Sequence, residues 1–553
     1  MNLLGPGYMK LDALSGFVGL FICLFSILVA IYSLPFMSGK KRQLSYYLYF
    51  LLTAIGSLGV VFSNNLVLLM VFWGILGLLL YLLIGFGQKP RTSYTAKKTF
   101  IIIGGTDAFM LMGLAIVWQL TGSMNIDSIS IPITDKWSVI AYLCLAVGAL
   151  AKAGAMPFHT WVPDTSEDAP IPVVAFLPAC LDKLLGIYLL ARISLDMFVL
   201  DAAMNTVLMI IGSVTIVAAV MMALVQHDLK RLLGYHAVSQ VGYMVLGIGT
   251  ANPIGIAGGL FHMLNNAIYK SMFFLSGGIV EKKAGTSDLD NLGGLAKALP
   301  LTFLCFLTGS FAISGVPPFN GFVSKWMIYQ GIIEMGKAGN GSWVIWLIAA
   351  MFGSALTLAS FMKLLHAIFL GQRSKALDDR GLSDEKVSRA MLLPVVLLAL
   401  LCIIFGVFAF SIPLRIFIIP AIKSNIMPIG IWEPGIASLM IIVGIVIGII
   451  LGLLGAANKG RVSKVFVGGE ELSAFPEMRL SGTEFYNNIQ NIPILKFLYV
   501  LAERKIFDIY EVGTKITLAF NALLRYIHNG VLSSYLAWCL LGMIILFYIF
   551  FLR

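Results

Sequence analysis

A series of about fourteen apolar stretches, each long enough to cross a membrane as a helix of about 20 residues, dominates this 553-residue chain. The chain is 59% hydrophobic and only 12% charged, a balance that soluble globular domains do not have. We therefore predict an all-α polytopic membrane protein. Its spans should lie near 12–34, 45–63, 65–86, 99–118, 138–157, 171–191, 204–225, 234–250, 254–280, 299–333 (interrupted), 343–370, 390–410, 435–456 and 531–552.

Positive charge is concentrated in alternate connections between these spans. The loops after odd-numbered spans hold seventeen Lys and Arg residues, whereas the loops after even-numbered spans hold five. Since Lys and Arg accumulate on the cytoplasmic side of membrane proteins, the asymmetry predicts that both chain termini lie outside. The loop after the fifth span is an exception, because it carries Asp164, Glu167 and Asp168.

Ionisable side chains interrupt several predicted spans. Lys270 lies near the middle of span 254–280, where a lysine costs about 2.5–3.5 kcal/mol. His262 and Asn266 precede it at helical spacing, so the three side chains line one face. Because charges inside membrane helices are usually functional, the pattern predicts an ion pathway. Further charges fall inside other spans at Asp107, Lys152, Asp182 and Lys183.

Two spans contain proline-rich breaks of the same kind. The fifth holds Gly154-Ala155-Met156-Pro157, and the tenth holds Gly315-Val316-Pro317-Pro318. Proline removes a backbone donor and clashes with the preceding turn, so each helix should be interrupted there. Lys152 precedes the first break and Lys325 follows the second, as two repeats of opposite orientation would place them.

The spacing of the breaks predicts the domain organisation. We expect an N-terminal span in 1–44, two inverted five-helix repeats at 45–192 and 204–370, and C-terminal spans in 390–456. Residues 457–530 are polar, and 494–528 within them are too charged to span a membrane. That segment predicts an amphipathic lateral helix on the inner surface. A final span should occupy 531–553.

The chain lacks the patterns that hold redox cofactors or nucleotides. Its six cysteines are scattered singly, without a CxxC pair or a Cys/His cluster, and it has no phosphate-binding glycine loop. We therefore expect no metal, no cofactor and no catalytic residue in this chain. The net charge of +11 is spread over the loops, so we expect membrane lipid rather than nucleic acid as a partner.

Several segments resemble the proton-conducting antiporter-like subunits of membrane complexes, over about 12–370 and more loosely through the C-terminal helices. Phe158–Asp164 and Ala169–Val173 resemble the family's F-x-x-W-x-P-D and A-P-x-P-V segments. Asp228–Met244 is similar to D-I-K-R-x-L-A-Y-S-T-x-S-Q-x-G-Y-M. Phe261–Lys270 resembles F-H-x-x-x-H-A-x-x-K, and Gly321–Lys325 resembles G-F-F-S-K.

Members of this family serve respiratory complex I, Mrp sodium/proton antiporters, membrane-bound nickel–iron hydrogenases and inorganic-carbon uptake complexes. The resemblance implies that buried lysines and histidines carry protons through the middle of the bilayer. Asn266 stands where many members have a second histidine; its amide can order water but cannot take up a proton. The residues that fall on family pathway positions are Asp107, Lys152, Lys183, His262, Lys270 and Lys325.

One residue departs sharply from the family pattern. Gly74 follows Trp73 where members usually have a glutamate that pairs with the lysine corresponding to Lys152. Because a nearby carboxylate stabilises a buried ammonium, we expect Asp182 or Asp107 to take over this role. Asp182 and Lys183 are adjacent on a helix, so we expect them to face other helices rather than each other.

The leading hypothesis is a proton- or sodium-translocating subunit of a redox-driven complex, either complex I-like or an energy-converting hydrogenase. Its partners should be other membrane subunits and redox subunits that carry clusters, in a prokaryotic inner (cytoplasmic) membrane. The run Phe507–Glu511 and His528-Asn529-Gly530 resemble the hydrogenase-linked and complex I-like members. Two alternatives stay open: an Mrp-type antiporter or inorganic-carbon uptake subunit, and a degenerate structural module.

Overall fold

The computed structural model describes residues 7–383, 386–424, 426 and 482–551, with six further positions between 439 and 450. These residues are helical apart from loops and one pair of two-residue strands. The chain divides into two compact units, Met1–Ile492 and Pro493–Arg553. Apart from the six positions, the predicted span 435–456 lies outside the described residues, and so do residues 457–481 of the polar stretch.

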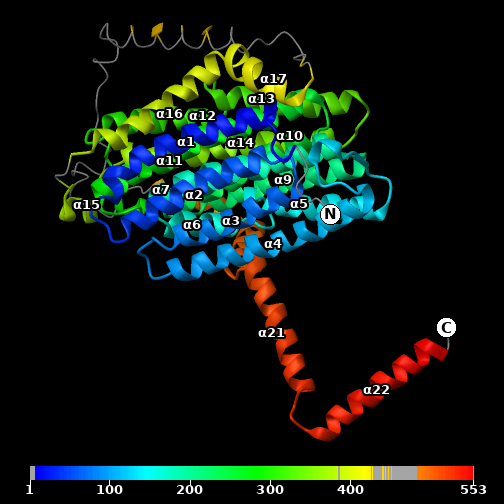
Figure 1. Cartoon of the computed structure of the whole chain (residues 1–553). Helices are drawn as coiled ribbons and strands as arrows, with labels where there is room; N and C mark the ends of the chain where they lie inside the picture. Colours follow the sequence, from blue (N-terminus) through cyan, green and yellow to red (C-terminus); the bar gives the residue numbers. More distant parts are fainter. Residues whose placement is uncertain are drawn as a thin grey trace. The chain divides into compact units, whose positions relative to one another are not determined.

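Four long helices open the first unit and lie side by side (Figure 1). The Asp12 carboxylate accepts a hydrogen bond from the Ser15 N–H at 2.9 Å, and the Asn65 side chain accepts from the Val67 and Leu68 N–H groups. These caps pair N–H groups that have no partner within their own helices. The helices are α1 (Ala13–Met37), α2 (Gln43–Phe62), α3 (Leu66–Ile84) and α4 (Thr92–Thr121).

Both predicted breaks are present. The fifth span consists of α5 (Lys136–Ala153) and α6 (Trp161–Asp168), and the tenth consists of α12 (Pro300–Ser314) and α13 (Asn320–Lys337). The sixth span is also irregular: α7 (Ile171–Phe176) and α8 (Asp182–Ala191) flank one π-helical segment, and a second follows α8. The sequence analysis did not predict these π-helical segments.

The other helices of the first unit pack around these elements. They are α9 (Ala202–Leu224), α10 (Leu229–Gly249), α11 (Pro253–Ala284), α14 (Trp343–Leu365), α15 (Lys375–Arg380), α16 (Arg389–Val407), α17 (Ile419–Ile422) and α19 (Asn487–Gln490). Strands β1 (Ile131–Pro132) and β2 (Phe198–Val199) pair in parallel, with Ile131 opposite Phe198. Short 3-10 turns lie at Ile126–Ser128, Leu289–Asn291 and Gly482–Glu484.

Ten helical segments in the described part of the chain are long and apolar enough to cross a membrane. They coincide with ten of the predicted spans. Predicted spans 234–250 and 254–280 correspond to α10 and α11, which carry polar residues near their middles, and 299–333 corresponds to α12 with α13. The predicted all-α polytopic architecture is therefore confirmed.

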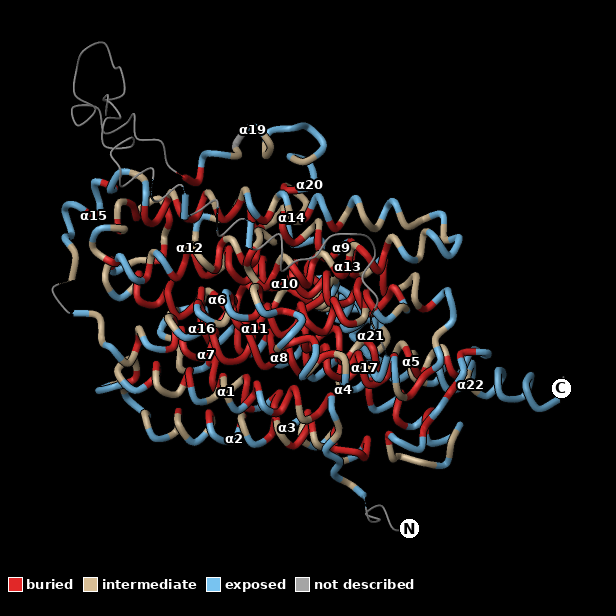
Figure 2. The backbone as a smooth tube through the Cα atoms, turned by 90° about the horizontal axis from the view of Figure 1, so that it is seen from above, coloured by how far each residue is buried: buried red, intermediate tan, exposed pale blue. Residues whose placement is uncertain are grey.

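The most enclosed helices are α10 and α11, as the burial colours in Figure 2 show. Every residue of α10 except Arg231 is buried, and α11 is buried without interruption from Ala257 to Val280. Helices α6, α9, α13 and α14 pack on α10. Protein therefore surrounds the polar side chains of these two helices on all sides.

Contacts between loops define two ends of the helix bundle. At one end β1 pairs with β2, and Asn65 forms an isolated bridge with Asn125. At the other end Asp228 forms a bridge with Asp288, and the Leu295 N–H donates to the Ile368 carbonyl at 3.2 Å. We call this second end, with loops 38–42, 85–91, 225–228, 285–299 and 371–383, the basic end, because it carries the lysine- and arginine-rich loops.

The second unit contains α20 (Pro493–Glu503), α21 (Ile509–Ile527) and α22 (Leu532–Phe551). The prediction of one continuous helix over 494–528 is wrong, because the chain leaves the helix after Glu503 and Lys505 has φ +57. The Asp508 carboxylate then caps α21 by accepting from the Tyr510 N–H at 3.1 Å. The predicted final span is present as α22.

Candidate ion pathway

Both broken helices end their first half in the same way. Gly154 has φ +79 and Gly315 has φ +82, a left-handed conformation that glycine adopts without strain and that commonly ends helices. The carbonyls freed at each break are bound from across it. The Trp161 indole donates to the Ala151 oxygen at 3.0 Å, and the Lys325 ammonium donates to the Ile313 oxygen at 2.8 Å.

Each of these glycines also makes room for a buried lysine. A Cβ atom on Gly154 would lie 3.1 Å from Lys183 Nζ, and one on Gly315 would lie 3.1 Å from Lys325 Cδ. Both contacts would be tighter than ordinary van der Waals packing. Lys183 and Lys325 therefore lie directly against the two backbone breaks.

Lys152 is buried at the end of α5 and faces an indole and two carboxylates. Its Nζ lies 4.9 Å from the centroid of the Trp73 ring, and the same indole donates to Asp107 Oδ1 at 3.0 Å. Asp182 and, more weakly, Asp107 attract the Lys152 ammonium electrostatically. The predicted grouping of Lys152 with these two aspartates is therefore present in the structure, although their role in ion transfer stays a prediction.

Asp182 and Lys183 are fully enclosed where α8 leaves the π-helical segment Leu177–Leu181. Asp182 interacts electrostatically with Lys152 first and with Lys183 second, so the expectation that it faces other helices alone is only half right. Lys183 Nζ lies 5.5 Å from the centroid of the Trp161 ring. Within the described residues, neither Lys183 Nζ nor Asp182 Oδ2 has a hydrogen-bond partner.

Lys270 on α11 connects this group to the second half of the bundle. Its ammonium donates to the Leu233 carbonyl on α10 at 3.1 Å and lies 5.6 Å from the centroid of the Phe361 ring on α14. The charges of Lys183 and Lys270 repel each other, although the two residues belong to different predicted repeats. A charge on one lysine therefore disfavours a charge on the other.

His262 lies between α10 and α13. Its Nδ1 is 2.9 Å from Ser324 Oγ, and its Nε2 is 3.1 Å from Gln240 Oε1. Asn266, one turn further along α11, is buried, and both of its amide atoms are without a hydrogen-bond partner among the residues described. The predicted stripe of His262, Asn266 and Lys270 therefore faces the protein interior.

A charge cluster at the basic end explains the acidic loop that departed from the positive-inside pattern. Lys98 Nζ lies 2.8 Å from an Asp164 oxygen, and Arg231 contacts Asp164 at 3.0 Å and Glu167 at 2.8 Å. Burial alone would raise the pKa of the Asp164 carboxyl, but the charges of Lys98 and Arg231 outweigh it and hold that pKa below its usual value. The cluster ties α6 to α4 and α10.

Comparison with known proteins identifies the family. The model of the membrane region of the NADH:quinone oxidoreductase/Mrp antiporter family matches residues 63–357. Over 423 residues the chain is 32% identical to NADH-quinone oxidoreductase subunit N of Desulforudis audaxviator, a match that covers 72% of this chain and 81% of that protein. The chain belongs to this antiporter family.

A second relative is the large Na(+)/H(+) antiporter protein of Alkalihalophilus pseudofirmus, 30% identical over 530 residues. That match covers 89% of this chain and 65% of the relative, and the chain spans about half to two thirds of the length of such antiporter proteins. Among solved structures, a chain of the archaeal membrane-bound sulfane sulfur reductase superposes with a TM-score of 0.79 at 23% identity. The superposition covers 97% of this chain and 89% of that one, and the two share a fold.

The position of the glutamate that other antiporter-family members carry lies on the outer side of α3. Gly74 is exposed, and a Cβ atom there would have no heavy atom within 4 Å. Trp73, the preceding residue, instead points inward against Lys152. In this member the carboxylates near Lys152 therefore come from Asp182 and Asp107 rather than from α3.

The sequence analysis missed two buried basic residues of the second half, His236 and Lys363. His236 Nε2 on α10 lies 2.7 Å from Ser360 Oγ, and Lys363 donates to the Leu224 and Gln226 carbonyls at 2.7 and 2.9 Å. A usable signal existed for His236, because it stands where the quoted family motif has serine. Lys363 binds the carbonyls at the end of α9, which is a helix-capping arrangement.

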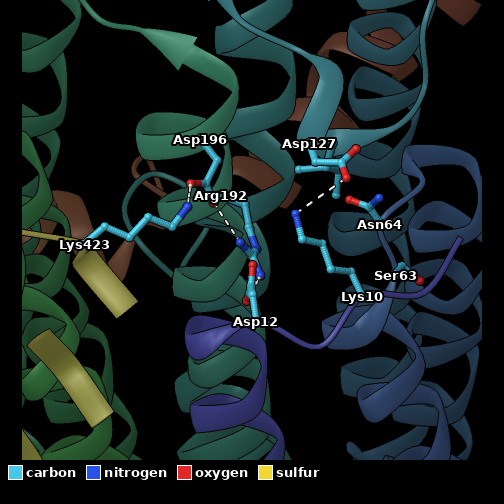
Figure 3. Close-up of a pocket in the computed structure, with 9 residues that line it drawn as sticks. Lys10, Asp12, Ser63, Asn64, Asp127, Arg192, Asp196 and Lys423 are labelled. Atoms are coloured by element: carbon cyan, nitrogen blue, oxygen red, sulfur yellow. Dashed lines mark hydrogen bonds and ion pairs between the residues drawn. The ribbon is translucent and has the colours of Figure 1, made fainter. Parts of the chain in front are cut away.

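A charged cavity of about 190 Å³ lies at the end opposite the basic end (Figure 3). Arg192 contacts Asp12 at 2.6 Å and Asp196 at 2.7 Å, and Lys423 contacts Asp196 at 3.2 Å. None of the predicted pathway residues lines this cavity. Within the part of the chain that the structure describes, no three His, Cys, Asp or Glu side chains group as a metal site would require.

Proposed function

We propose that this chain is an ion-translocating, antiporter-like subunit of a larger membrane complex. The supporting observation is the series of enclosed basic side chains that begins at Lys152, includes Lys183 and Lys270, and ends at Lys325. Each of these lysines is buried, and consecutive ones lie on different helices. Because a charge in a membrane interior is costly, a series of this kind supports transfer of ions along it.

The residues suggest how a proton would move. Asp182 stabilises a proton on either Lys152 or Lys183, since it interacts with both. Protonation of Lys183 then disfavours protonation of Lys270, which releases its proton toward His262 and Lys325. A change of charge at one end of the series can in this way propagate to the other.

We infer that protons rather than sodium ions move through the second half. Sodium is a hard cation that prefers oxygen ligands, as calcium and magnesium do. The described ionisable side chains there are His236, His262, Lys270, Lys325 and Lys363, all of which carry positive charge or none. Sodium exchange, as in the Mrp-type alternative, would have to use other groups.

We further propose a redox-driven complex, whose membrane partners contact this chain and whose redox partners carry the clusters. The C-terminal resemblance to hydrogenase-linked and complex I-like members supports it. The basic end would face the cytoplasm and both termini the outside of a prokaryotic inner membrane, which agrees with the positive-inside rule. The matching glycines at the breaks support two inverted repeats at 45–192 and 204–370.

Replacement of Lys270 by alanine tests the proposal. The complex would be purified through a tag on this chain and reconstituted into proteoliposomes that contain a pH-sensitive dye. We expect Lys270→Ala to lower proton translocation at least about tenfold, the smaller end of what a proton-transfer group contributes. Lys282→Ala, at the exposed end of the same helix, should keep the wild-type rate. An unchanged rate in Lys270→Ala would contradict the proposal.

A further inference from the structure

Helix α10 carries a stripe of polar groups that contacts the basic residues of the second half in order. Leu233, His236, Gln240 and Tyr243 are spaced by three, four and three residues, so they share one face of the helix. The Leu233 carbonyl binds Lys270, and Gln240 Oε1 is 3.1 Å from His262 Nε2. His236 lies between them, about one helical turn from each.

Tyr243 completes the stripe at its far end. Its ring centroid lies 5.3 Å from that of His262 and 4.6 Å from Lys325 Nζ. Along this face of α10 the basic groups therefore follow one another as Lys270, His236, His262 and Lys325. The Phe361 ring reinforces the first step, because it lies 4.9 Å from the His236 ring and 5.6 Å from Lys270 Nζ, measured from its centroid.

The two nitrogens of His236 differ in their surroundings. Nε2 lies 2.7 Å from Ser360 Oγ, whereas the buried Nδ1 has no hydrogen-bond partner in the described ranges. The charges that act on this ring come from three helices: Lys270 on α11, Lys325 on α13 and Lys363 on α14. A histidine with one nitrogen fixed and the other available can accept a proton at one atom and release one from the other.

We propose that His236 is the proton carrier that links Lys270 to His262 and Lys325, in place of the second histidine that Asn266 has replaced. The inference rests on the proposed function. A proton from the Lys270 ammonium would add to His236 Nδ1, and the imidazolium would release its other proton from Nε2 through the Ser360 hydroxyl. The transfer leaves Lys270 neutral and returns His236 to its neutral form.

A structural alternative makes a distinct prediction. If His236 served only to hold Ser360 and fill space, a polar side chain of similar reach would replace it. Glutamine can donate to or accept from the Ser360 hydroxyl, but it cannot take up a proton. His236→Gln therefore separates proton transfer from packing.

The experiment compares proton translocation by reconstituted complexes. We expect His236→Gln to assemble normally and to translocate at least about tenfold more slowly than wild type. We expect a double variant with Asn266→His to recover a substantial part of the rate, because it returns a titratable ring to the stripe. The matched control is His227→Gln, at an exposed histidine paired with Asp290 beside the start of α10.

The outcomes separate this inference from the proposed function. If Lys270→Ala lowers the rate but His236→Gln keeps it, the relay is overturned and the proposed function stands. If Lys270→Ala also keeps the wild-type rate, the proposed function fails. A slow His236→Gln complex that Asn266→His does not accelerate would contradict the assignment, because packing alone would then explain the loss. If His236→Gln prevents assembly, His236→Ser, which restores the family residue, is compared in the same way.

Discussion

Two carboxylates near Lys152 differ in their environment at the scale of single residues. Asp182 is buried, attracts both Lys152 and Lys183, and has an oxygen without a described hydrogen-bond partner. Asp107 is partly exposed, and the Trp73 indole already binds its Oδ1 at 3.0 Å. Asp182 is therefore the carboxylate that most directly replaces the glutamate missing at residue 74.

Neutralising each carboxylate separately tests this difference. We expect Asp182→Asn to reduce proton translocation about tenfold, a loss of about 1.4 kcal/mol in transition-state stabilisation, because Lys152 and Lys183 lose their shared counterion. Asp107→Asn should cost less. Asp127→Asn, whose partner is the exposed Lys10, serves as control in the same proteoliposome assay. A larger loss in Asp107→Asn than in Asp182→Asn would reverse the assignment.

At the scale of elements, the broken helix α5–α6 is held at the basic end by ion pairs. Both members of the Lys98–Asp164 pair are buried, and Arg231 joins Asp164 to α10. Glu167 extends the cluster, because hydrogen bonds and charges from Arg231 and Lys89 outweigh its burial and lower the pKa of its carboxyl. The cluster should therefore fix the orientation of α6 beside the pathway.

The lowered pKa values of Asp164 and Glu167 give this cluster a defined pH dependence. Their stabilisation should be complete above the unfolded-state values, about 3.9 for Asp and 4.3 for Glu, and lost as the pH falls through the lower folded-state values. At pH 7 we expect Asp164→Asn to destabilise the first unit by about 3 kcal/mol, because Lys98 would remain buried without its counterion. Thermal unfolding in detergent measures this, with the exposed Asp379→Asn as control. Equal melting temperatures would contradict the clamp.

Sequence could predict those elements whose cause is local. The breaks at Gly154 and Gly315 follow from proline and glycine, and the enclosed lysines follow from charge within apolar runs. The break after Glu503 has neither proline nor glycine, so one helix was predicted where there are two. Periodicity also does not identify neighbours on other helices: it could not reveal that Asp182 interacts with Lys152 and Lys183, or that His236 lies between Lys270 and His262.

At the scale of the whole first unit, the two predicted repeats are joined by the interaction between Lys183 and Lys270. The first half supplies carboxylates with its lysines, and the described second half supplies basic residues and amides. A proton that enters one half should therefore influence occupancy in the other. The central claim is that these groups form one continuous pathway rather than two separate ones.

The most direct test is the proton translocation rate of Lys183→Ala in the reconstituted complex, compared with Lys270→Ala. A continuous pathway predicts that either substitution alone lowers the rate at least about tenfold, and that the double variant is no slower than the slower single variant. Two independent pathways would instead leave about half of the wild-type rate in each single variant, with losses that add in the double variant. Half of the wild-type rate in Lys183→Ala would contradict the account.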